Sequence, residues 1–282
     1  MTTDRHPYAG LTAVMATKHH KVPLVAPALA TSVGMTVVAA PVDTDALGTF
    51  SGEVPRPGTP WQTAVAKAHL GLNQVGGRVG LASEGSVGPH PSAPFLLAAT
   101  ELVVLVDREL GIVTGEVETS LDLRTVSMRL APGDPLDAVL ERGDLPRHAV
   151  IVRPAEGPVS VVGKGLRQPS DIAHWIARAA AASADGHAIV ETDLRAHECP
   201  SRRPIIERAA RRLAERVASC CPSCRTPGFG VVSVEAGAPC SQCAAPTRLP
   251  SAHVWRCQCC DLTERRPTLT VAQPAQCPWC NP

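Results

Sequence analysis

Eight cysteines near the carboxyl end are spaced as pairs that could hold metal ions. The four Cys-X-X-Cys pairs are Cys221 and Cys224, Cys240 and Cys243, Cys257 and Cys260, and Cys277 and Cys280. A tight turn lets both thiolates of such a pair face one ion, and two pairs complete a tetrahedron. The spacing therefore predicts two structural zinc ions, each held by four thiolates.

The order in which these pairs share an ion is less constrained. Fifteen residues separate the first two pairs and 16 separate the last two, which suits a short hairpin, so we expect neighbouring pairs to share an ion. An interleaved arrangement is the alternative. Cys220 and Cys259 adjoin ligands and could replace them, and Cys199 is isolated. A redox-sensing role for these three thiols is a further hypothesis.

Metal binding explains these cysteines better than disulfides do. Residues 1–16 show no charged-then-apolar order and no cleavage site, so we expect a cytoplasmic chain in a reducing compartment. The uncharged stretch 22–42 contains Pro23, Pro27 and Gly34 and favours a helix followed by a strand over a membrane span. Four thiolates leave a zinc ion no open position, which favours a structural role. We expect no membrane partner.

Four polar segments in the first 199 residues could carry out chemistry at the ends of strands. They are Thr17–Lys21, Asp43–Glu53 with Arg56 beyond it, Ala82–Pro91 and Thr192–His197. Each is expected where a strand ends or a helix begins, and in open α/β sheets those ends form the ligand crevice. We predict that the four segments meet in one cavity.

Lysine usage points to phosphate as the ligand. Of 27 lysines and arginines only four are lysines, namely Lys18, Lys21, Lys67 and Lys164. A bias toward arginine would remove lysine wherever either cation served, so the surviving lysines suggest a need for a compact ammonium group beside phosphate. Chance placement is the alternative.

Carboxylates and hydroxyls in the same segments complete a predicted phosphate site. Hard oxygen ligands beside phosphate suit Mg²⁺, for which Asp43 and Glu53 are the candidate ligands. The candidate catalytic groups are Asp45, Glu84 and His90. The candidate substrate-binding residues are Lys18, His19, Lys21, Thr49, Ser51, Arg56, Lys67, Ser83, Ser86, Arg195 and His197. For any single residue, turn or capping chemistry is the competing explanation.

The elements that must position these residues alternate between strand and helix. Apolar runs predict strands at 11–16, 35–40, 78–82, 101–106, 110–117, 149–152, 160–162 and 188–191. Helices are expected at 22–33, 59–74, 135–142, 169–183 and 203–219. The Gly- and Pro-rich segments 43–58 and 83–94 are expected to be loops. The pattern predicts an α/β fold, with a mixed sheet flanked by helices and a carboxyl-terminal double zinc-ribbon module.

Charge and composition divide the chain into three parts. Residues 1–199 carry 16 lysines and arginines against 21 acids, and residues 200–282 carry 11 arginines against five acids. We expect an α/β domain at 1–199, a linking helix at 200–219 and two zinc ribbons at 220–282. The apolar face of the linking helix would consist of Ile206, Ala209, Ala210, Leu213 and Val217.

The basic tail leaves two classes of partner open. The whole chain has a net charge of +1 and 3% aromatic residues, which gives it no general affinity for nucleic acid. The excess of arginine after residue 200 nevertheless suits a nucleic-acid or protein partner. Arginines packed against the acidic body are the simpler explanation, because opposite charges on neighbouring surfaces attract.

The motifs TKHHK, DTDALGTFSGE, ASEGSVGPHP and TDLRAH, between Tyr8 and Arg203, resemble signature blocks of a bacterial domain-of-unknown-function family. More distantly, the order of strand, lysine loop, helix, strand, acidic loop and lysine helix resembles pyrophosphatases of non-standard nucleoside triphosphates. That resemblance implies phosphate contacts for Lys18 or Lys21 and for Lys67, and Mg²⁺ contacts for Glu53 or Glu84.

The sequence thus favours an enzyme that acts on a phosphorylated small molecule, such as a Mg²⁺-dependent nucleotide phosphohydrolase or pyrophosphohydrolase, with structural zinc in the tail. The alternative is a binding protein whose zinc ribbons recognise nucleic acid or a protein, with a scaffold that is not catalytic.

Overall fold

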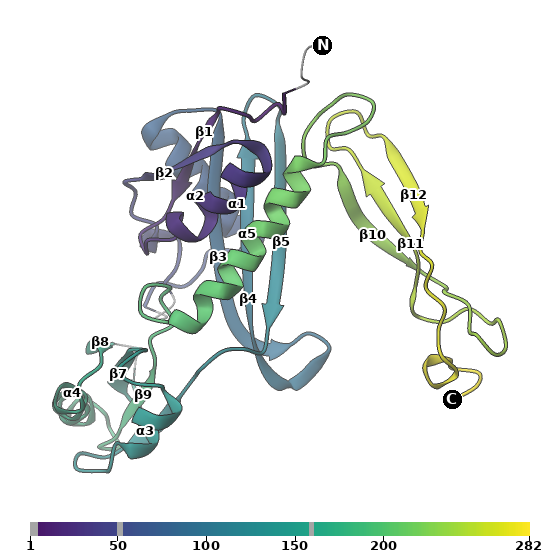
Figure 1. The fold of residues 1–282 in the computed structure, drawn as a ribbon. Helices are drawn as coiled ribbons and strands as arrows, with labels where there is room; N and C mark the ends of the chain where they lie inside the picture. The colour runs from purple at the N-terminus through teal and green to yellow at the C-terminus, as the bar shows by residue number, and fades with distance from the viewer. Residues whose placement is uncertain (1–4, 50–52, 158–160) are drawn as a thin grey trace.

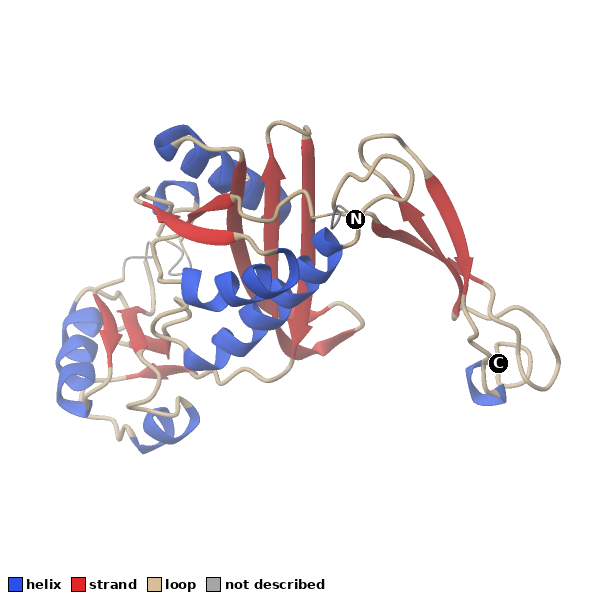
Figure 2. Cartoon of the chain, turned by 45° about the horizontal axis from the view of Figure 1, so that its top comes forward, coloured by secondary structure: helices blue, strands red, loops and turns tan. Residues whose placement is uncertain are grey.

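Three separate sheets organise the chain (Figures 1 and 2). The computed structural model describes residues 5–49, 53–157 and 161–282. A five-stranded sheet lies at the centre, a four-stranded sheet lies beside it, and a three-stranded sheet projects on the other side as the carboxyl-terminal tail (Figure 1). Helices and mixed strands confirm the predicted α/β class.

The central sheet has three parallel strands and an antiparallel extension. In spatial order its strands are β2 (Thr36–Ala40), β1 (Thr12–Ala16), β3 (Val79–His90), β4 (Ala93–Asp107) and β5 (Ile112–Ser120). Strand β1 pairs in parallel with both β2 and β3, and the remaining pairs are antiparallel. Short local signals delimit the helices that connect these strands. Helix α1 (Val22–Val33) ends at the left-handed Gly34, and helix α2 (Pro60–Val75) begins with a capping box between Thr59 and Gln62.

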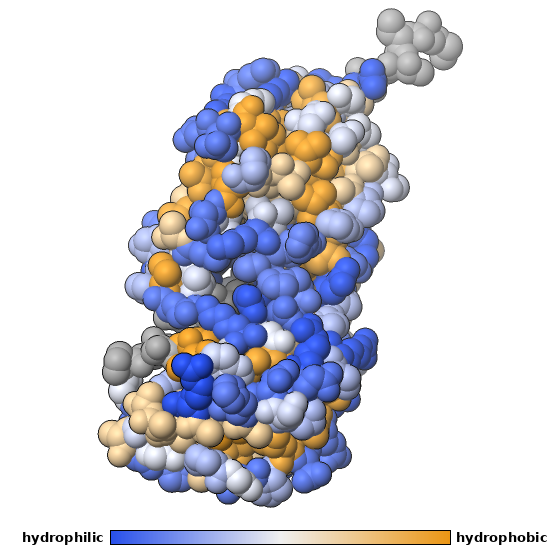
Figure 3. Space-filling model, turned by 90° about the vertical axis from the view of Figure 1, so that its left-hand side faces the viewer, coloured by the Kyte–Doolittle hydropathy of each residue, from blue (hydrophilic) through white to orange (hydrophobic). Residues whose placement is uncertain are grey.

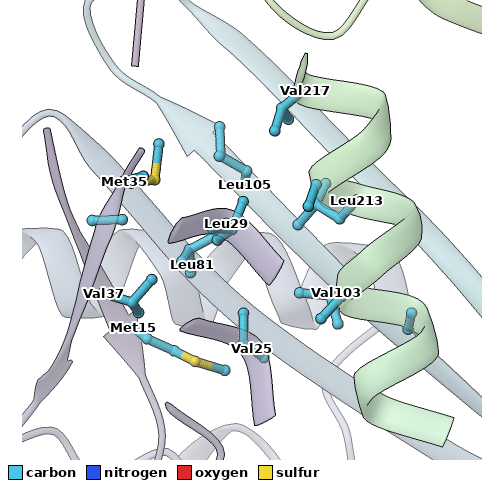
Figure 4. Packing of buried hydrophobic residues seen from close by; sticks show 14 of the residues in the cluster. Met15, Val25, Leu29, Met35, Val37, Leu81, Val103, Leu105, Leu213 and Val217 are labelled. Atoms are coloured by element: carbon cyan, nitrogen blue, oxygen red, sulfur yellow. The ribbon is translucent and has the colours of Figure 1, made fainter. Parts of the chain in front are cut away.

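The larger apolar core lies on one face of this sheet, beneath α1 and helix α5 (Arg203–Ala218) (Figure 4). Met15, Leu81 and Val103 from the strands meet Leu29 of α1 and Leu213 of α5. Burial of each such side chain contributes about 1.5–3 kcal/mol. The predicted apolar face of α5 is confirmed, because all five of its residues are buried.

The opposite face of the sheet packs against α2 through small residues. Ala64, Ala68 and Leu72 are buried against the strands. A methyl group on Gly71 would lie 3.2 Å from the Ala16 side chain, so helix and sheet approach closely there. This approach brings α2, and Lys67 on it, to the ends of the parallel strands.

The prediction of a loop at 83–94 is wrong. Strand β3 continues to His90, and the whole of β3 pairs with β4. Glycine in this segment resembles a turn signal but has another use. Gly85 leaves room within the strand, because a methyl group at that position would collide with Arg202 Nη2. The long apolar strand β4 supplies the pairing partner that extends β3.

The second sheet comes from the stretch between β5 and α5. Its spatial order is β6 (Ser127–Leu130), β9 (Ala188–Thr192), β7 (Val150–Pro154) and β8 (Gly163–Leu166), with helices α3 (Asp137–Arg142) and α4 (Pro169–Ala181). The strand expected at 160–162 instead forms at β8, and Ser160 lies outside the described residues. Strand β8 forms where Gly163 lets the backbone approach Trp175, since a methyl group on Gly163 would lie 2.7 Å from the indole ring.

The tail is an antiparallel sheet of β10 (Gly230–Ala236), β11 (Pro250–Arg256) and β12 (Thr263–Pro267), with β11 in the middle. It follows α5 directly and extends away from the central sheet (Figure 1). Its buried apolar cluster is small and includes two of the cysteines, Cys221 and Cys257, together with Phe229.

Candidate functional site

The parallel strands create a crevice between β1 and β3. The chain leaves β1 through α1 to reach β2 on one side, then returns through α2 to β3 on the other side. At such a change of direction the connections diverge, and the carboxyl ends of the strands form an open site. Here those ends carry Thr17–Lys21 after β1 and Ser83–Gly85 within β3.

A cavity of about 230 Å³ occupies this crevice, and we call it the switch-point cavity. Its polar lining consists of Thr17, Lys18, His19, Lys21, Thr44, Asp45, Thr49, Arg56, Lys67, Ser83 and Glu84. A second cavity of about 280 Å³ shares part of that lining and adds Glu53, Lys164, Arg195 and His197. All four polar segments of the sequence therefore contribute to two adjoining cavities. Figure 3 shows a band of hydrophilic side chains across the middle of one face of the molecule.

Carboxylates hold two of the lysines in the cavity. Lys18 Nζ lies 2.5 Å from Asp45 Oδ2 and 3.1 Å from Asp43 Oδ1, in a solvent-exposed cluster. Lys67 forms a buried ion pair with Glu84, and Arg56 Nη2 lies 3.2 Å from the same carboxylate. Hydrogen bonds from the Asp45 backbone N–H and from Lys18 hold the pKa of Asp43 below its usual range.

Lys21 has a different environment from the other lysines. Its side chain is buried, and Nζ hydrogen-bonds to Ser83 Oγ at 2.9 Å. Burial lowers the pKa of Lys21 to about 8, while the nearby Glu101 acts in the opposite direction and Arg202 adds to the lowering. Lys21 also stands immediately before α1, whose amino-terminal dipole favours negative charge.

Three histidines lie together beside the cavities: His19 lines both of them, His197 lines the second, and His20 contacts His197. The rings of His19 and His197 stack with centroids 4.8 Å apart, and His20 meets His197 edge-on at 6.5 Å. Burial, followed by the charges of His197 and Lys21, lowers the pKa of His19 to about 4. Burial is also the main cause that lowers the pKa of His197. Both rings are therefore neutral at pH 7 and can accept a proton or a hydrogen bond.

The second sheet supplies the outer wall. Arg195 is held by the buried Asp193, with Nη2 2.5 Å from Oδ2, and the backbone N–H of Gly165 donates to the same carboxylate at 3.1 Å. Lys164 on β8 forms an ion pair with Glu53. The Lys164–Glu53 pair joins the second sheet to the loop that follows β2, whereas Arg195 is fixed by its own neighbour Asp193.

Two candidates from the predicted loop lie away from the cavity. His90 stands at the tip of the β3–β4 hairpin, where its Nδ1 accepts a hydrogen bond from the Ser92 backbone at 3.1 Å. Ser86 does not line the switch-point cavity but a neighbouring depression with Trp61 and Thr100, which shares Glu84 and Gly85 with that cavity. A compact loop would have kept both residues near the cavity, but an extended strand separates successive residues by about 3.3 Å. Strand extension therefore carries them past the site.

Each of the two predicted magnesium ligands is paired with a lysine. Asp43 pairs with Lys18 and Glu53 pairs with Lys164, so a lysine ammonium neutralises each carboxylate. Within the described residues, only two sets of cysteines bring three or more metal-binding side chains together. Ser51 lies outside the described residues. The magnesium site remains a prediction.

Sequence reasoning missed a buried ion pair beneath the cavity. Arg202 and Glu101 are both almost fully enclosed, and Arg202 Nε donates to Glu101 Oε1 at 2.6 Å. The pair occupies the space that Gly85 leaves open. No local pattern could have predicted this pair, because 101 positions separate its two residues and Gly85, between Glu84 and Ser86, resembles a turn residue.

The tail cysteines form two interleaved quartets. Cys221 and Cys224 join Cys257 and Cys260, whereas Cys240 and Cys243 join Cys277 and Cys280. The expected pairing of neighbours is wrong, and the interleaved alternative is correct. The physical reason is that each intervening segment forms a strand of one shared sheet, which carries successive pairs to alternate ends.

The quartets fit zinc. The Sγ atoms of Cys221 and Cys260, and those of Cys224 and Cys257, are 3.6 Å apart. In the other quartet Cys240 and Cys280 are separated by 3.9 Å. A tetrahedron with Zn–S bonds of about 2.3 Å requires sulfurs about 3.8 Å apart, whereas a disulfide requires about 2 Å. Either quartet can thus hold one ion.

Comparison with known families assigns the chain. A family model described as "Domain of unknown function (DUF6671)" matches residues 67–282, which is most of the sequence. The chain belongs to this family. The DUF6671 match includes Lys67, Ser83 and both cysteine quartets, and it begins after the segments that contain Lys18 and Asp45. No curated protein matches the chain. None of the helices in the described residues is both long and apolar enough to span a membrane.

Within the DUF6671 region the first quartet touches the central sheet. Gln258, between the ligands Cys257 and Cys260, accepts a hydrogen bond from the Val113 backbone N–H at 3.1 Å and donates to its C=O at 2.8 Å. Arg216 of α5 donates to the carbonyls of Gly228 and Val231 at 2.7 Å each. The tail is therefore attached to the start of edge strand β5 and to the carboxyl-terminal part of α5.

Most tail arginines have carboxylate partners. On α5, Arg208 and Arg212 contact Glu118 of β5, at 2.8 and 3.3 Å. In the tail sheet, ion pairs join Arg256 to Asp261, Arg265 to Glu235 and Arg266 to Glu264. These contacts agree with the simpler explanation for the arginines on α5. A nucleic-acid or protein partner remains a prediction.

Proposed function

We propose that the protein is an enzyme that binds a small phosphorylated molecule in the switch-point cavity and cleaves its phosphoryl bond. The observation that carries the proposal is the charge of the lining. Six cations, namely Lys18, Lys21, Arg56, Lys67, Lys164 and Arg195, face the two adjoining cavities. Five carboxylates line the cavities or pair with these cations, namely Asp43, Asp45, Glu53, Glu84 and Asp193, which leaves one positive charge in excess. A phosphate group would balance this excess.

The ion pairs do not remove these cations from use. An ammonium has three N–H donors and a guanidinium has five, so each can hold a carboxylate and still donate to phosphate. Asp45 and Glu84 then act as supports that fix the direction of Lys18 and Lys67. A preorganised cation costs little reorganisation when charge develops on a phosphoryl oxygen.

The adjoining cavity suits the remainder of the substrate. Arg195, Lys164 and the stacked ring of His197 offer donors and one flat surface next to the phosphate position. A nucleotide or a sugar phosphate has both a polar ring and a phosphate. Lys18, Lys21 and Lys67 all line the cavity, which supports the phosphate roles that the resemblance to pyrophosphatases implies.

Magnesium and zinc have separate places in the proposal. Two zinc ions would be structural, held by eight thiolates in the tail. Magnesium would enter with the phosphates of the substrate, because such ions are commonly held by one or two carboxylates plus substrate oxygens. Asp45 and Glu84 are the carboxylates that line the cavity nearest those phosphates.

A substrate screen with matched variants tests the proposal. The zinc-loaded full chain is incubated with nucleotides, sugar phosphates and pyrophosphate, with and without Mg²⁺, and released phosphate is measured. We expect turnover that falls at least tenfold in Lys18→Ala and is unchanged in Arg129→Ala. Arg129 is an appropriate control because it is an exposed cation paired with a carboxylate, Asp185, in the second sheet. Absence of both turnover and a ligand-induced rise in melting temperature would refute the proposal.

A further inference from the structure

The chain's four lysines differ in what neutralises them. Lys18 pairs with Asp43 and Asp45, Lys67 with Glu84, and Lys164 with Glu53. Among the described residues, Lys21 has no carboxylate within ion-pair distance, and the hydrogen bond of its Nζ is to the hydroxyl of Ser83. The most buried lysine is thus the one joined to a neutral oxygen instead of an acid.

An amine in that position is suited to accept a proton. A buried ammonium without a carboxylate costs solvation free energy, so burial raises the fraction of neutral amine near pH 8 while the charged form still predominates at pH 7. The groups packed around it act in both directions. Glu101 on β4 and Glu84 on β3 favour the charged form of Lys21. Lys67 on α2, and Arg202 just before α5, oppose the charged form. Burial is the largest effect, and it lowers the pKa of Lys21 to about 8.

Ser83 is placed to use that amine. It lies on β3 beside Ala82, which is opposite the last residue of β1, so its hydroxyl reaches the start of α1 where Lys21 stands. Both side chains are buried and both line the switch-point cavity. A nucleophile within hydrogen-bond reach of a base, inside a substrate cavity, is the arrangement of a serine–lysine dyad.

Resting on the proposed function, we infer that Ser83 is the nucleophile of the reaction and Lys21 its general base, with a phosphoserine as the intermediate. The Ser83 Oγ attacks phosphorus and gives its proton to the neutral Lys21 Nζ. The bond from phosphorus to the leaving oxygen breaks, and that oxygen takes the proton from Lys21. Water then attacks the phosphoserine, and its proton passes through Lys21 to Oγ as the phosphorus–Oγ bond breaks. Inorganic phosphate leaves, and no other reagent is consumed.

The other cations have complementary roles in this step. Arg56 Nη2 donates a hydrogen bond to the carbonyl of Gly85 at 2.8 Å, and Gly85 lies two residues after Ser83. Arg56 and Lys67 flank the same strand and can donate to the equatorial oxygens of the transferred group. Lys18 lies on the exposed side, where the leaving group would depart.

Covalent labelling with diisopropyl fluorophosphate tests the dyad. The zinc-loaded full chain is treated across pH 6–10, and the modified residue is located by mass spectrometry. We expect one adduct, on Ser83, that forms at a rate rising with pH around a midpoint near 8, as the pKa of Lys21 requires. Ser83→Ala should abolish the adduct, and Lys21→Met should slow its formation at least 100-fold. Ser120→Ala, which removes another buried serine of the same sheet, should label like the wild type.

Folding and phosphate binding are followed in the same samples. If Lys21→Met does not fold, Lys21→Arg keeps a cation but provides no base at these pH values, and the same loss is expected. An unlabelled Ser83 in protein that still binds and turns over a phosphorylated ligand would overturn the dyad and leave the proposed function intact. Failure of labelling, turnover and pyrophosphate-induced stabilisation together would overturn both.

Discussion

The switch-point cavity and the cysteine tail gather charged groups by opposite means. In the tail, eight thiolates from a short stretch of chain require metal ions to offset their charge. In the cavity, lysines and carboxylates from distant segments neutralise one another in pairs, as do Lys164 and Glu53, which are 111 positions apart. The body has its own apolar core, whereas the tail's cluster is small. Tail stability should therefore follow the metal, and body stability should follow the core and the ion pairs.

Loss of a thiolate from the quartet that contacts the central sheet should have the largest effect. This quartet consists of Cys221, Cys224, Cys257 and Cys260. Cys257→Ser removes one of four ligands and with it much of the metal binding energy, which in isolated zinc modules is about 10–16 kcal/mol. We expect bound zinc to fall from two ions to one and residues 220–282 to become protease-sensitive, while the body still melts cooperatively. Metal analysis and limited proteolysis measure both.

A matched variant in the other quartet shows how far the loss of one zinc ion loosens the tail. That quartet consists of Cys240, Cys243, Cys277 and Cys280. Cys277→Ser breaks the quartet at the far end of the tail sheet and leaves untouched the hydrogen bonds of Gln258 to Val113. Proteolysis should then be confined to the far end of the tail sheet, at the β10–β11 connection that carries Cys240 and Cys243 and at the residues beyond β12. If either variant unfolds the body as well, the two regions are not independent.

Within the body, crowding the buried ion pair should cost most. In Gly85→Ala the new methyl group would collide with Arg202 Nη2 and lie 2.8 Å from Glu101 Oε2. Disruption of a buried pair costs about 3–5 kcal/mol. Gly88→Ala on the same strand is the control, because no atom lies within 4 Å of its added methyl, and it should change stability by less than about 0.5 kcal/mol. Urea denaturation provides the measurement, and equal stability of the two variants would show that Gly85 is not needed to admit the pair.

A smaller loss is expected from the buried lysine of the cavity. Lys67→Met leaves Glu84 buried with Arg56 as its remaining cation, which should cost about 3 kcal/mol of unfolding free energy. Lys18→Ala should cost much less, because the lysine is 46% exposed and solvent screens its ion pairs. Both variants should weaken pyrophosphate binding. Calorimetric unfolding and titration separate the two effects, and a larger loss of stability in Lys18→Ala would reverse the expected order.

Histidine protonation should have a smaller effect than the loss of Lys67. Because the pKa of His19 is lowered to about 4, the unfolded chain binds a proton below about pH 6.5 that the folded chain does not. The contribution of neutral His19 to the free energy of unfolding is therefore fully present above pH 6.5 and decreases as the pH falls from 6.5 toward 4. After solvent screening we expect roughly 1–2 kcal/mol. His19→Asn should flatten this part of the pH–stability curve, and an unchanged slope would show that His19 is not responsible.

The sequence predicts the composition of both sites better than their geometry. The Cys-X-X-Cys spacing identifies all eight ligands, because each pair is a local turn. It misjudges which pairs combine, because that depends on strands that carry alternate pairs to opposite ends of the tail sheet. Likewise, the resemblance to pyrophosphatases implies phosphate contacts for Lys18 or Lys21 and for Lys67, and all three lysines line one cavity.

The errors in the body share one cause. Gly85 and Gly88 resemble turn residues, and a turn there would place Ser86 and His90 at the site. The structure uses Gly85 to admit Arg202 from 117 positions further along the chain, a long-range contact that no local pattern contains. For the same reason the neutral partner of Lys21 could not be inferred from spacing, since Ser83 lies 62 residues away.

A crystal structure of the zinc-loaded full chain with pyrophosphate tests the proposed phosphate site most directly. We expect pyrophosphate in the switch-point cavity, with one phosphoryl group within hydrogen-bond distance of Lys67 and Arg56 and its phosphorus facing Ser83 Oγ. Pyrophosphate bound only at the arginines of the tail, with the cavity unchanged, would refute the assignment of this cavity as the active site.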